Sequence, residues 1–339
     1  MTLALSADRP EDIRKAGEIL RGGGLVAIPT ETVYGLAAAV FDPAAVARVF
    51  AAKGRPADNP LIVHVAEIVD IPKVCAQAPP IAPALAKRFW PGPLTLVMPR
   101  RDNVPDGVTA GLPTVAVRCP ANDAARAVIR AAGVPLAAPS ANRAGFPSPT
   151  TAAHVWNDMD GRVDAILDGG PCRWGVESTI LDLTGPVPRL LRPGGVTRAQ
   201  LEAVLGTVEV DPAVTGPVTE GHSPRAPGMK YRHYAPHAPI YLLHGPLNAA
   251  ATYVKALARP GTAVLCFNGE QERFRPVPCV PYGDGDSPES LARGLFEALR
   301  KLDAPEIRCI YARCPEGDGL YEAVRNRLSR AAGFAVIEV

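Results

Sequence analysis

The sequence has almost no net charge and no long hydrophobic run. Its 36 Lys and Arg residues stand against 34 Asp and Glu residues, which leaves a formal charge of +2. Because the positive and negative charges nearly cancel, there is no global electrostatic field that would draw the chain to nucleic acid or to a membrane. Any basic site must therefore be local. No stretch approaches eighteen apolar residues, and residues 1–10 have no charged start before an apolar core. We expect no membrane partner and a cytoplasmic location.

The chain also lacks the signatures of dinucleotide enzymes, P-loop enzymes, serine hydrolases and zinc sites. No G-x-G-x-x-G follows the first expected strand of the second half, and no G-x-x-x-x-G-K occurs. No G-x-S-x-G elbow marks a serine nucleophile. Among seven cysteines the closest pair is Cys309 and Cys314, with no second pair at zinc spacing, so we expect reduced structural thiols. His233 and His237 are four residues apart, but Pro236 disfavours a shared helical zinc face.

Proline, in contrast, is in excess. The 37 prolines are about twice the ordinary usage, and they cluster between apolar runs, where they mark rigid loops. With 339 residues and 47% hydrophobic content, the chain can bury at least one large core. Its length predicts about two domains.

The first half of the chain alternates helical patterns with short apolar runs. Helical spacing predicts helices at 10–21, 43–52, 81–89 and 123–132. Runs bounded by Gly, Pro, Asn or Asp predict strands at 25–29, 61–65, 94–98, 115–118, 135–138, 165–167, 179–183 and 189–191. The alternation predicts an α/β domain with a mixed, buried sheet.

A Pro- and Gly-rich stretch separates this half from the rest. Residues 206–238 contain no run long enough for a core element and predict a linker, which nevertheless carries an aromatic and basic segment at 229–234. Beyond it, strands at 240–243, 263–267 and 307–311 alternate with helical patterns at 247–258, 288–302 and 321–332, which predicts a small parallel α/β unit of Rossmann-like type. The expected domains are therefore 1–205 and 239–339, joined by the linker 206–238.

Polar residues gather at the ends of the expected strands, where open sheets bind ligands. The segment 29–36, Pro-Thr-Glu-Thr-Val-Tyr-Gly-Leu, follows the first of them, although Thr-Glu-Thr is equally suited to cap a helix. Lys53 and Arg55 flank a glycine before a proline-fixed loop that contains Asn59. One cation there would serve to complement the helix dipole, whereas two predict a site for an anion.

Three further loops repeat this theme. Arg118 ends an otherwise apolar strand, so a carboxylate clamp and an internal salt bridge remain equally open for it. Ser140 and Asn142 follow another apolar strand, although Ser-Ala-Asn is also compatible with a simple turn. Segments 175–179 and 192–195 again place polar groups beside glycine. Together the loops predict a pocket for phosphates and a carboxylate, in a nucleotide-using enzyme that needs cations and positioning more than a strong base.

Taken jointly, these motifs closely resemble the YrdC family of threonylcarbamoyl-AMP synthases. Lys53-x-Arg55, Ser140-x-Asn142 and the segment 29–36 carry the resemblance, which spans about residues 22–195. The segment 223–236, Ser-Pro-Arg-Ala-Pro-Gly-Met-Lys-Tyr-Arg-His-Tyr-Ala-Pro, is similar to the linker of the longer, two-domain branch. The resemblance implies a YrdC-like twisted mixed sheet with helices and a smaller C-terminal Rossmann-like domain. It also implies a nucleotidyl transfer, in which L-threonine, bicarbonate and ATP give threonylcarbamoyl-adenylate and pyrophosphate.

The family pattern implies a role for each matching residue. Lys53, Arg55, Ser140 and Asn142 would form the catalytic set. Contacts to ATP would come from Arg55, Asn59, Thr114, Asn142, Thr150, Arg192, Tyr231 and Tyr234, the two tyrosines acting as a lid. Threonine would be held by Thr32, His64, Arg118, Ser140 and Ser178, with Arg118 on its carboxylate and Tyr34 packed beside the pocket.

The resemblance also implies cofactors and partners. Magnesium is expected because ATP is the substrate, but its protein ligands cannot be named from the sequence, and Glu31 and Glu177 are no more than candidates. The product would pass to a tRNA threonylcarbamoyl-transfer machinery that modifies the adenosine next to the anticodon, with weak contact of tRNA itself left open. One alternative is a carbamoyl-adenylate-forming carbamoyltransferase, which would need further modules. The other is a tRNA- or dsRNA-binding module, which the near-zero net charge weakens.

Overall fold

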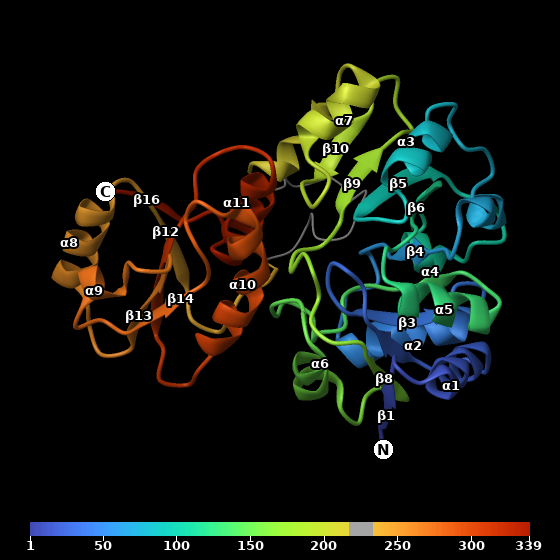
Figure 1. Cartoon of the computed structure of the whole chain (residues 1–339), viewed down its shortest axis with the longest axis horizontal. Helices are drawn as coiled ribbons and strands as arrows, with labels where there is room; N and C mark the ends of the chain where they lie inside the picture. The colour runs from blue at the N-terminus through green and yellow to red at the C-terminus, as the bar shows by residue number, and fades with distance from the viewer. Residues whose placement is uncertain (217–232) are drawn as a thin grey trace.

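Two sheets organise the protein (Figure 1). The computed structural model describes residues 1–216 and 233–339. Within these residues, one mixed sheet has eleven strands and the other has five. Helices α10 and α11 lie between the smaller sheet and the body that contains the larger one (Figure 1). The prediction of a mixed α/β unit followed by a second, parallel one is confirmed, whereas the exact domain boundaries stay a prediction.

The larger sheet has the strand order β1-β8-β2-β3-β7-β4-β6-β5-β9-β10-β11. Its strands are β1 Leu3–Ser6, β2 Val26–Ile28, β3 Gly35–Ala39, β4 Ile62–His64, β5 Leu94–Pro99, β6 Thr114–Arg118, β7 Leu136–Ala137, β8 Ala165–Asp168, β9 Thr179–Asp182, β10 Arg189–Arg192 and β11 Glu209–Val210. The helices around it are α1 Pro10–Arg21, α2 Pro43–Lys53, α3 Ala82–Phe89, α4 Asp106–Thr109, α5 Asp123–Ala132, α6 Ala152–Met159 and α7 Arg198–Leu205, with 3₁₀ turns η1 Ile68–Lys73 and η2 Pro212–Val214. Each predicted strand and helix of this half is found, within a few residues at its ends.

The smaller sheet is parallel in every described pair, with the order β14-β13-β15-β12-β16. Its strands are β12 Ile240–His244, β13 Thr262–Cys266, β14 Cys279–Pro281, β15 Cys309–Arg313 and β16 Val336–Glu338, and its helices are α8 Leu247–Leu257, α9 Gln271–Phe274, α10 Pro288–Lys301 and α11 Leu320–Ala331. Parallel pairing needs a crossover between strands, and α8, α10 and α11 supply three of them. The prediction of a parallel Rossmann-like unit is therefore confirmed.

Local sequence signals explain how α2 delivers its cations. The Asp42 side chain caps the start of the helix by accepting hydrogen bonds from the N–H groups of Ala44 and Ala45. Gly54 ends it in the left-handed region at φ 63°, a conformation that glycine adopts without steric cost. Lys53 is thus the last residue of the helix, and Arg55 starts the next loop in a new direction.

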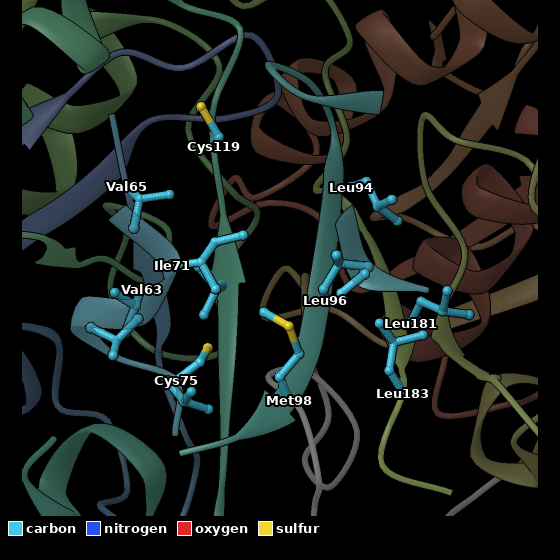
Figure 2. Packing of buried hydrophobic residues seen from close by; sticks show 14 of the residues in the cluster. Val63, Val65, Ile71, Cys75, Leu94, Leu96, Met98, Cys119, Leu181 and Leu183 are labelled. Carbon is cyan, nitrogen blue, oxygen red and sulfur yellow. The ribbon is translucent and has the colours of Figure 1, made fainter. Parts of the chain in front are cut away.

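The packed interior joins the two sheets. The largest buried cluster includes side chains from the strands of the larger sheet. Among them, Val63, Leu96 and Leu181 come from three different strands (Figure 2). A second cluster combines Val33 and Val176 of the first half with residues of α10, α11 and the smaller sheet. Apolar side chains of the two halves therefore pack together in this second cluster. No helix in the described residues is both long and apolar enough to cross a bilayer.

Candidate active site

A cavity of about 310 Å³ collects the sequence motifs. Of the predicted site residues, its lining contains Thr32, Lys53, Arg55, Asn59, His64, Arg118, Ser140, Asn142, Ser178, Arg192 and Tyr234. These residues come from segments spread over more than 200 positions of the chain. Their convergence confirms that the loops predicted from the sequence line one pocket.

Lys53 ties two of the motifs together. Its side chain is 3% exposed, and Nζ donates hydrogen bonds to the backbone carbonyls of Ser140, at 2.5 Å, and Asn142. Two of the three ammonium donors are thereby taken up by the Ser-x-Asn loop. Burial and the neighbouring charge of Arg55 lower the pKa of Lys53. Lys53 therefore fixes the loop and also brings a poorly solvated positive charge to the cavity.

Two arginines add to this positive charge. The guanidinium of Arg55 donates to the carbonyls of Asn59 and Pro60. Burial, together with the nearby charge of Arg192, lowers the pKa of Arg55 to about 10. Burial likewise lowers the pKa of Arg192 to about 10. Because cations are held here away from water, an anion that entered the cavity would relieve the cost of their burial.

Hydrogen-bond acceptors without donors lie beside these cations. Among the described residues, Oδ1 of Asn59 and Oδ1 of Asn142 are buried and have no hydrogen-bond partner. The amide nitrogen of Asn142, by comparison, donates to the carbonyls of Arg143, at 2.7 Å, and Phe146, at 2.9 Å. Buried acceptors of this kind are costly unless a ligand completes them. The cavity thus suits a ligand with both anionic groups and N–H or O–H donors.

Arg118 is the last residue of β6, and its guanidinium contacts Thr32 and Glu31. Its Nη1 donates to Thr32 Oγ1 at 2.9 Å, and its Nη2 lies 2.6 Å from Glu31 Oε1. The second contact is an ion pair rather than a hydrogen bond, since in the described structure neither atom meets hydrogen-bond geometry. Thr32 Oγ1 also pairs with Thr30 Oγ1 at 2.9 Å. Of the two readings left open for Arg118, the internal salt bridge is present, while its side chain still lines the cavity.

His64 stands next to Arg118 in a parallel strand pair, in which the two residues are direct partners. Nδ1 lies 3.2 Å from the carbonyl of Ile62, which assigns the proton to Nδ1 and leaves Nε2 as an acceptor. Burial, together with the charge of Arg118, lowers the pKa of His64 to about 3. The imidazole is therefore neutral over the physiological pH range.

A carboxylate network forms the wall beside Ser178. Glu177 Oε1 accepts a hydrogen bond from Ser148 Oγ at 2.5 Å, and both residues line the cavity. Arg192 donates to the carbonyl of Ser178 at 3.0 Å and to its hydroxyl at 3.3 Å. Thr95 pairs with the same hydroxyl at 2.8 Å. Ser178 is thus held by backbone and side chain at once, which fixes its position in the wall.

The linker contributes Tyr234 and His233 to the cavity. Tyr234 is buried at a positive φ of 65°, and its ring centroid lies 5.2 Å from that of Phe296 on α10. The N–H of Ala235 donates to the carbonyl of Gly145 at 2.9 Å, which anchors this end of the linker to the larger half. Tyr231 lies outside the described residues, so its predicted role in a lid stays a prediction.

The structure places three of the named residues elsewhere. Thr114 starts β6, four residues before Arg118, and lines a separate hollow with Asp182 and Arg189. Thr150 contacts the ring of His154 rather than the cavity. The hydroxyl of Tyr34 donates to the carbonyl of Gly170 at 2.7 Å. Thr114 and Thr150 were predicted to contact ATP, and neither lines the cavity. Tyr34 was predicted only to pack beside the pocket, without contacting a ligand.

Three residues of the lining lie in segments noted in the sequence but were given no individual role there. Thr30, Ser148 and His233 line the cavity in addition to the residues predicted for it. Ser148 lies in the segment Gly-Phe-Pro-Ser-Pro-Thr, in which two hydroxyl residues are two positions apart. The resemblance pointed to Thr150, and only the fold shows that Ser148 is the one that faces inward.

In the described residues, the acidic side chains do not cluster into a metal site. Glu31 is paired with Arg118 and lies outside the lining, and Glu177 is occupied by Ser148 and by Arg327, whose Nε is 2.7 Å from Oε2. In the described part of the chain, no group of three or more His, Cys, Asp or Glu residues is placed to hold a metal ion. The described residues therefore offer no cluster of side chains that could hold a metal ion by protein ligands alone.

Comparison with known proteins identifies the family. A family model described as Telomere recombination matches residues 18–194, and one described as Threonylcarbamoyl-AMP synthase, C-terminal domain, matches residues 196–333. A threonylcarbamoyl-AMP synthase of Pyrococcus abyssi is 46% identical over 333 residues, covering 96% of each chain. One of Bacillus subtilis is 44% identical over 342 residues, covering 99% of this chain and 97% of the relative. A solved structure of Pyrococcus abyssi Sua5 complexed with L-threonine is 43% identical and superimposes with a TM-score of 0.91, covering 100% of this chain and 99% of that one. The chain belongs to the family of two-domain threonylcarbamoyl-AMP synthases.

Proposed function

We infer that this chain is a threonylcarbamoyl-AMP synthase, which converts L-threonine, bicarbonate and ATP to threonylcarbamoyl-adenylate and pyrophosphate. The observation that carries the inference is the single cavity that joins Lys53, Arg55 and Arg192 to Thr32, His64 and Arg118. The cations suit a triphosphate, and the second group suits a small amino acid. The relatives that carry this activity in their names match nearly the whole chain.

On the nucleotide side, the cations would hold and polarise the phosphates. Arg55 and Arg192 would lie against the α-phosphate and the departing pyrophosphate, where negative charge develops. Lys53 would act chiefly by holding the Ser-x-Asn loop, since its ammonium is bonded to that loop. The orphan acceptors of Asn59 and Asn142 would take N–H or O–H groups of the nucleoside. Tyr234, buried among Arg55, Arg192 and Phe296, would cover the nucleotide.

On the amino-acid side, one cation and several neutral polar groups line the cavity and could contact a small ligand. Arg118 would receive the threonine carboxylate, with Glu31 holding the guanidinium from behind at 2.6 Å. The free Nε2 of neutral His64 would accept from the substrate hydroxyl or amine. Thr32, Ser140 and Ser178 would complete the contacts, because all three line the same cavity. Thr114 and Thr150 are not part of this proposal, since they lie outside the lining.

The chemistry then requires alignment rather than a strong base. The amine of threonine first reacts with bicarbonate, forming an N–C bond and releasing water, and the oxygen of the resulting carbamate is itself an anionic nucleophile. The oxygen attacks the α-phosphate, the bond to the bridging oxygen breaks, and pyrophosphate departs toward the cations. Magnesium bound by the nucleotide's phosphates and by water is the form we propose, because the described residues contain no group of three or more His, Cys, Asp or Glu that could hold it.

Release of pyrophosphate tests the proposal. The purified protein is incubated with ATP and bicarbonate, with L-threonine, without it, and with L-serine in its place. We expect release that depends on threonine and is much weaker with serine, which lacks the methyl group. Release that is equal with and without threonine would contradict the proposed function. A tRNA threonylcarbamoyl-transfer machinery is the proposed consumer of the product.

A further inference from the structure

Arg327 connects the smaller half of the protein to the wall of the cavity. It belongs to α11, and its side chain is fully buried, with 0% exposure. Nε donates to Glu177 Oε2 at 2.7 Å, Nη2 to the carbonyl of Glu177 at 3.1 Å, and Nη1 to the carbonyl of Pro193 at 2.9 Å. The guanidinium thus spends most of its donors on two loops that lie more than 130 positions away in the chain.

Both loops carry residues of the cavity. Glu177 precedes Ser178. Its second carboxylate oxygen, Oε1, accepts a hydrogen bond from the Ser148 hydroxyl at 2.5 Å. Pro193 follows Arg192, whose guanidinium donates to the carbonyl of Ser178 at 3.0 Å. Arg327 is therefore hydrogen-bonded to Glu177, which precedes Ser178, and to Pro193, which follows Arg192.

The backbones of the two loops are in close contact with their surroundings. A Cβ added to Gly194 would lie 2.3 Å from the backbone nitrogen of Thr179, so the loops touch through their backbones. A Cβ added to Gly175 would lie 2.5 Å from the carbonyl oxygen of Ala292 on α10. The position of the loops is consequently set by contact with the smaller half as well as by their own strands.

The charge of Arg327 matters as well as its shape. A buried carboxylate is destabilised by desolvation, which alone would raise the pKa of Glu177. Arg327, then Arg192, and hydrogen bonds from Ser148 and Arg327 outweigh this and lower the pKa of Glu177. The carboxylate therefore stays ionised and keeps Ser148 as its donor.

We propose that Arg327 is a positioning residue for the synthase reaction, acting through Glu177 on Ser148 and through the Pro193 carbonyl on Arg192. The inference rests on the proposed function. It gives the smaller half of the protein a part in catalysis: α11 supplies the group that holds the phosphate-facing and threonine-facing loops in register. Arg327 itself does not line the cavity, so it touches no substrate.

The first test separates positioning from folding. Arg327→Met removes the charge and the donors, and we expect kcat/KM for ATP to fall about 10- to 100-fold, the scale for a small misplacement of reacting groups. Arg327→Lys should recover part of this loss, because an ammonium can still reach Glu177 but cannot serve three acceptors in fixed directions. Kinetics are read on full-length protein, with thermal unfolding measured beside them. Wild-type kcat and KM values in a folded Arg327→Met variant would overturn the proposal.

A second variant guards against loss of folding. Arg327→Met leaves Glu177 buried without its partner, so the double variant Arg327→Met/Glu177→Gln removes both charges together. We expect this protein to fold and to keep the lowered kcat/KM for ATP, because residue 177 and the Pro193 carbonyl have still lost the donors of Arg327. A folded double variant with wild-type KM and kcat would also overturn the proposal.

A matched control and a coupling measurement complete the design. Glu297→Ala breaks another contact between the halves, the 2.6 Å pair with His154, whose ring does not line the cavity. We expect it to lower thermal stability while leaving KM and kcat near wild type. Ser148→Ala combined with Arg327→Met should cost less than the product of the single effects, because both act on Glu177. Full multiplicativity would contradict the proposed route.

The outcome for this inference is distinct from that for the proposed function. If the wild-type protein releases no pyrophosphate with threonine, the proposed function fails and the variants have no reference. If the wild type is active and the Arg327 variants match it, the function stands and only the positioning role is refuted.

Discussion

The acid sensitivity of the fold should be traceable to His64. This residue is buried beside Arg118, and burial lowers its folded-state pKa to about 3 from 6.5. Below pH 6.5 the unfolded chain therefore binds a proton at this position that the folded protein does not take up. The free energy of unfolding rises with pH between about 3 and 6.5, and His64's share of it is lost as the pH falls through that window.

The size of the effect follows from the two pKa values. Between pH 7 and pH 5, protonation of His64 in the unfolded chain alone costs the folded state about 2 kcal/mol. His64→Gln keeps a polar side chain of similar length but removes the titration. The wild type should therefore lose about 2 kcal/mol more than the variant on going from pH 7 to pH 5. His233, with a pKa also lowered to about 3, is present in both proteins and cancels in the comparison.

Urea unfolding followed by tryptophan fluorescence measures this difference. Wild type and His64→Gln are compared at pH 7 and at pH 5, at matched ionic strength. Equal losses of unfolding free energy in the two proteins would refute the reasoning, because they would mean that His64 is protonated equally in both states. A greater loss in the variant would contradict its sign.

Three other predictions concern the cavity. Lys53→Ala should lower the rate of pyrophosphate release by about 10²- to 10³-fold, because the Ser-x-Asn loop loses its anchor; Arg55→Ala should do the same by removing a phosphate contact. A folded variant with an unchanged rate would take that residue out of the mechanism. Tyr234→Ala should raise KM for ATP, whereas Tyr234→Phe should stay near wild type, because the ring rather than the hydroxyl packs on Phe296. Full activity in a Tyr231/Tyr234 double alanine variant would refute the lid proposal. Thr114→Val should leave KM for ATP unchanged and Asn59→Leu should raise it, because only Asn59 lines the cavity; steady-state kinetics with varied ATP would show a reversed order if the nucleotide reaches Thr114.

The sequence predicted the elements whose signals are local. The helix 10–21 has proline at its first position and glycine after its last, and the structure begins and ends it at the same residues. Strand β3, by contrast, was not predicted. Its residues Gly-Leu-Ala-Ala-Ala lack β-branched side chains, and it is held as a strand by pairing with β2 and β7 on either side. Tertiary pairing here overrides a weak local preference.

The residues of the candidate site likewise fall into those with a local sequence signal and those placed only by tertiary contacts. Lys53 and Arg55 could be found because they flank a glycine at a helix end, and Ser140 and Asn142 because they follow an apolar run. Arg327 gave no such signal, since it sits in a helix with several other charged residues, and its burial depends on Glu177 and Pro193 far away in the chain. Thr150 had a signal as good as that of Ser148, and only the fold decides between them.

The identity of the product tests the central claim most directly. The protein is incubated with L-threonine, ATP and ¹³C-bicarbonate, and the nucleotide fraction is analysed at once by mass spectrometry. The account predicts an adenylate that carries both threonine and one ¹³C atom, formed in step with pyrophosphate. An unlabelled threonyl-adenylate, or a labelled adenylate that lacks threonine, would contradict it.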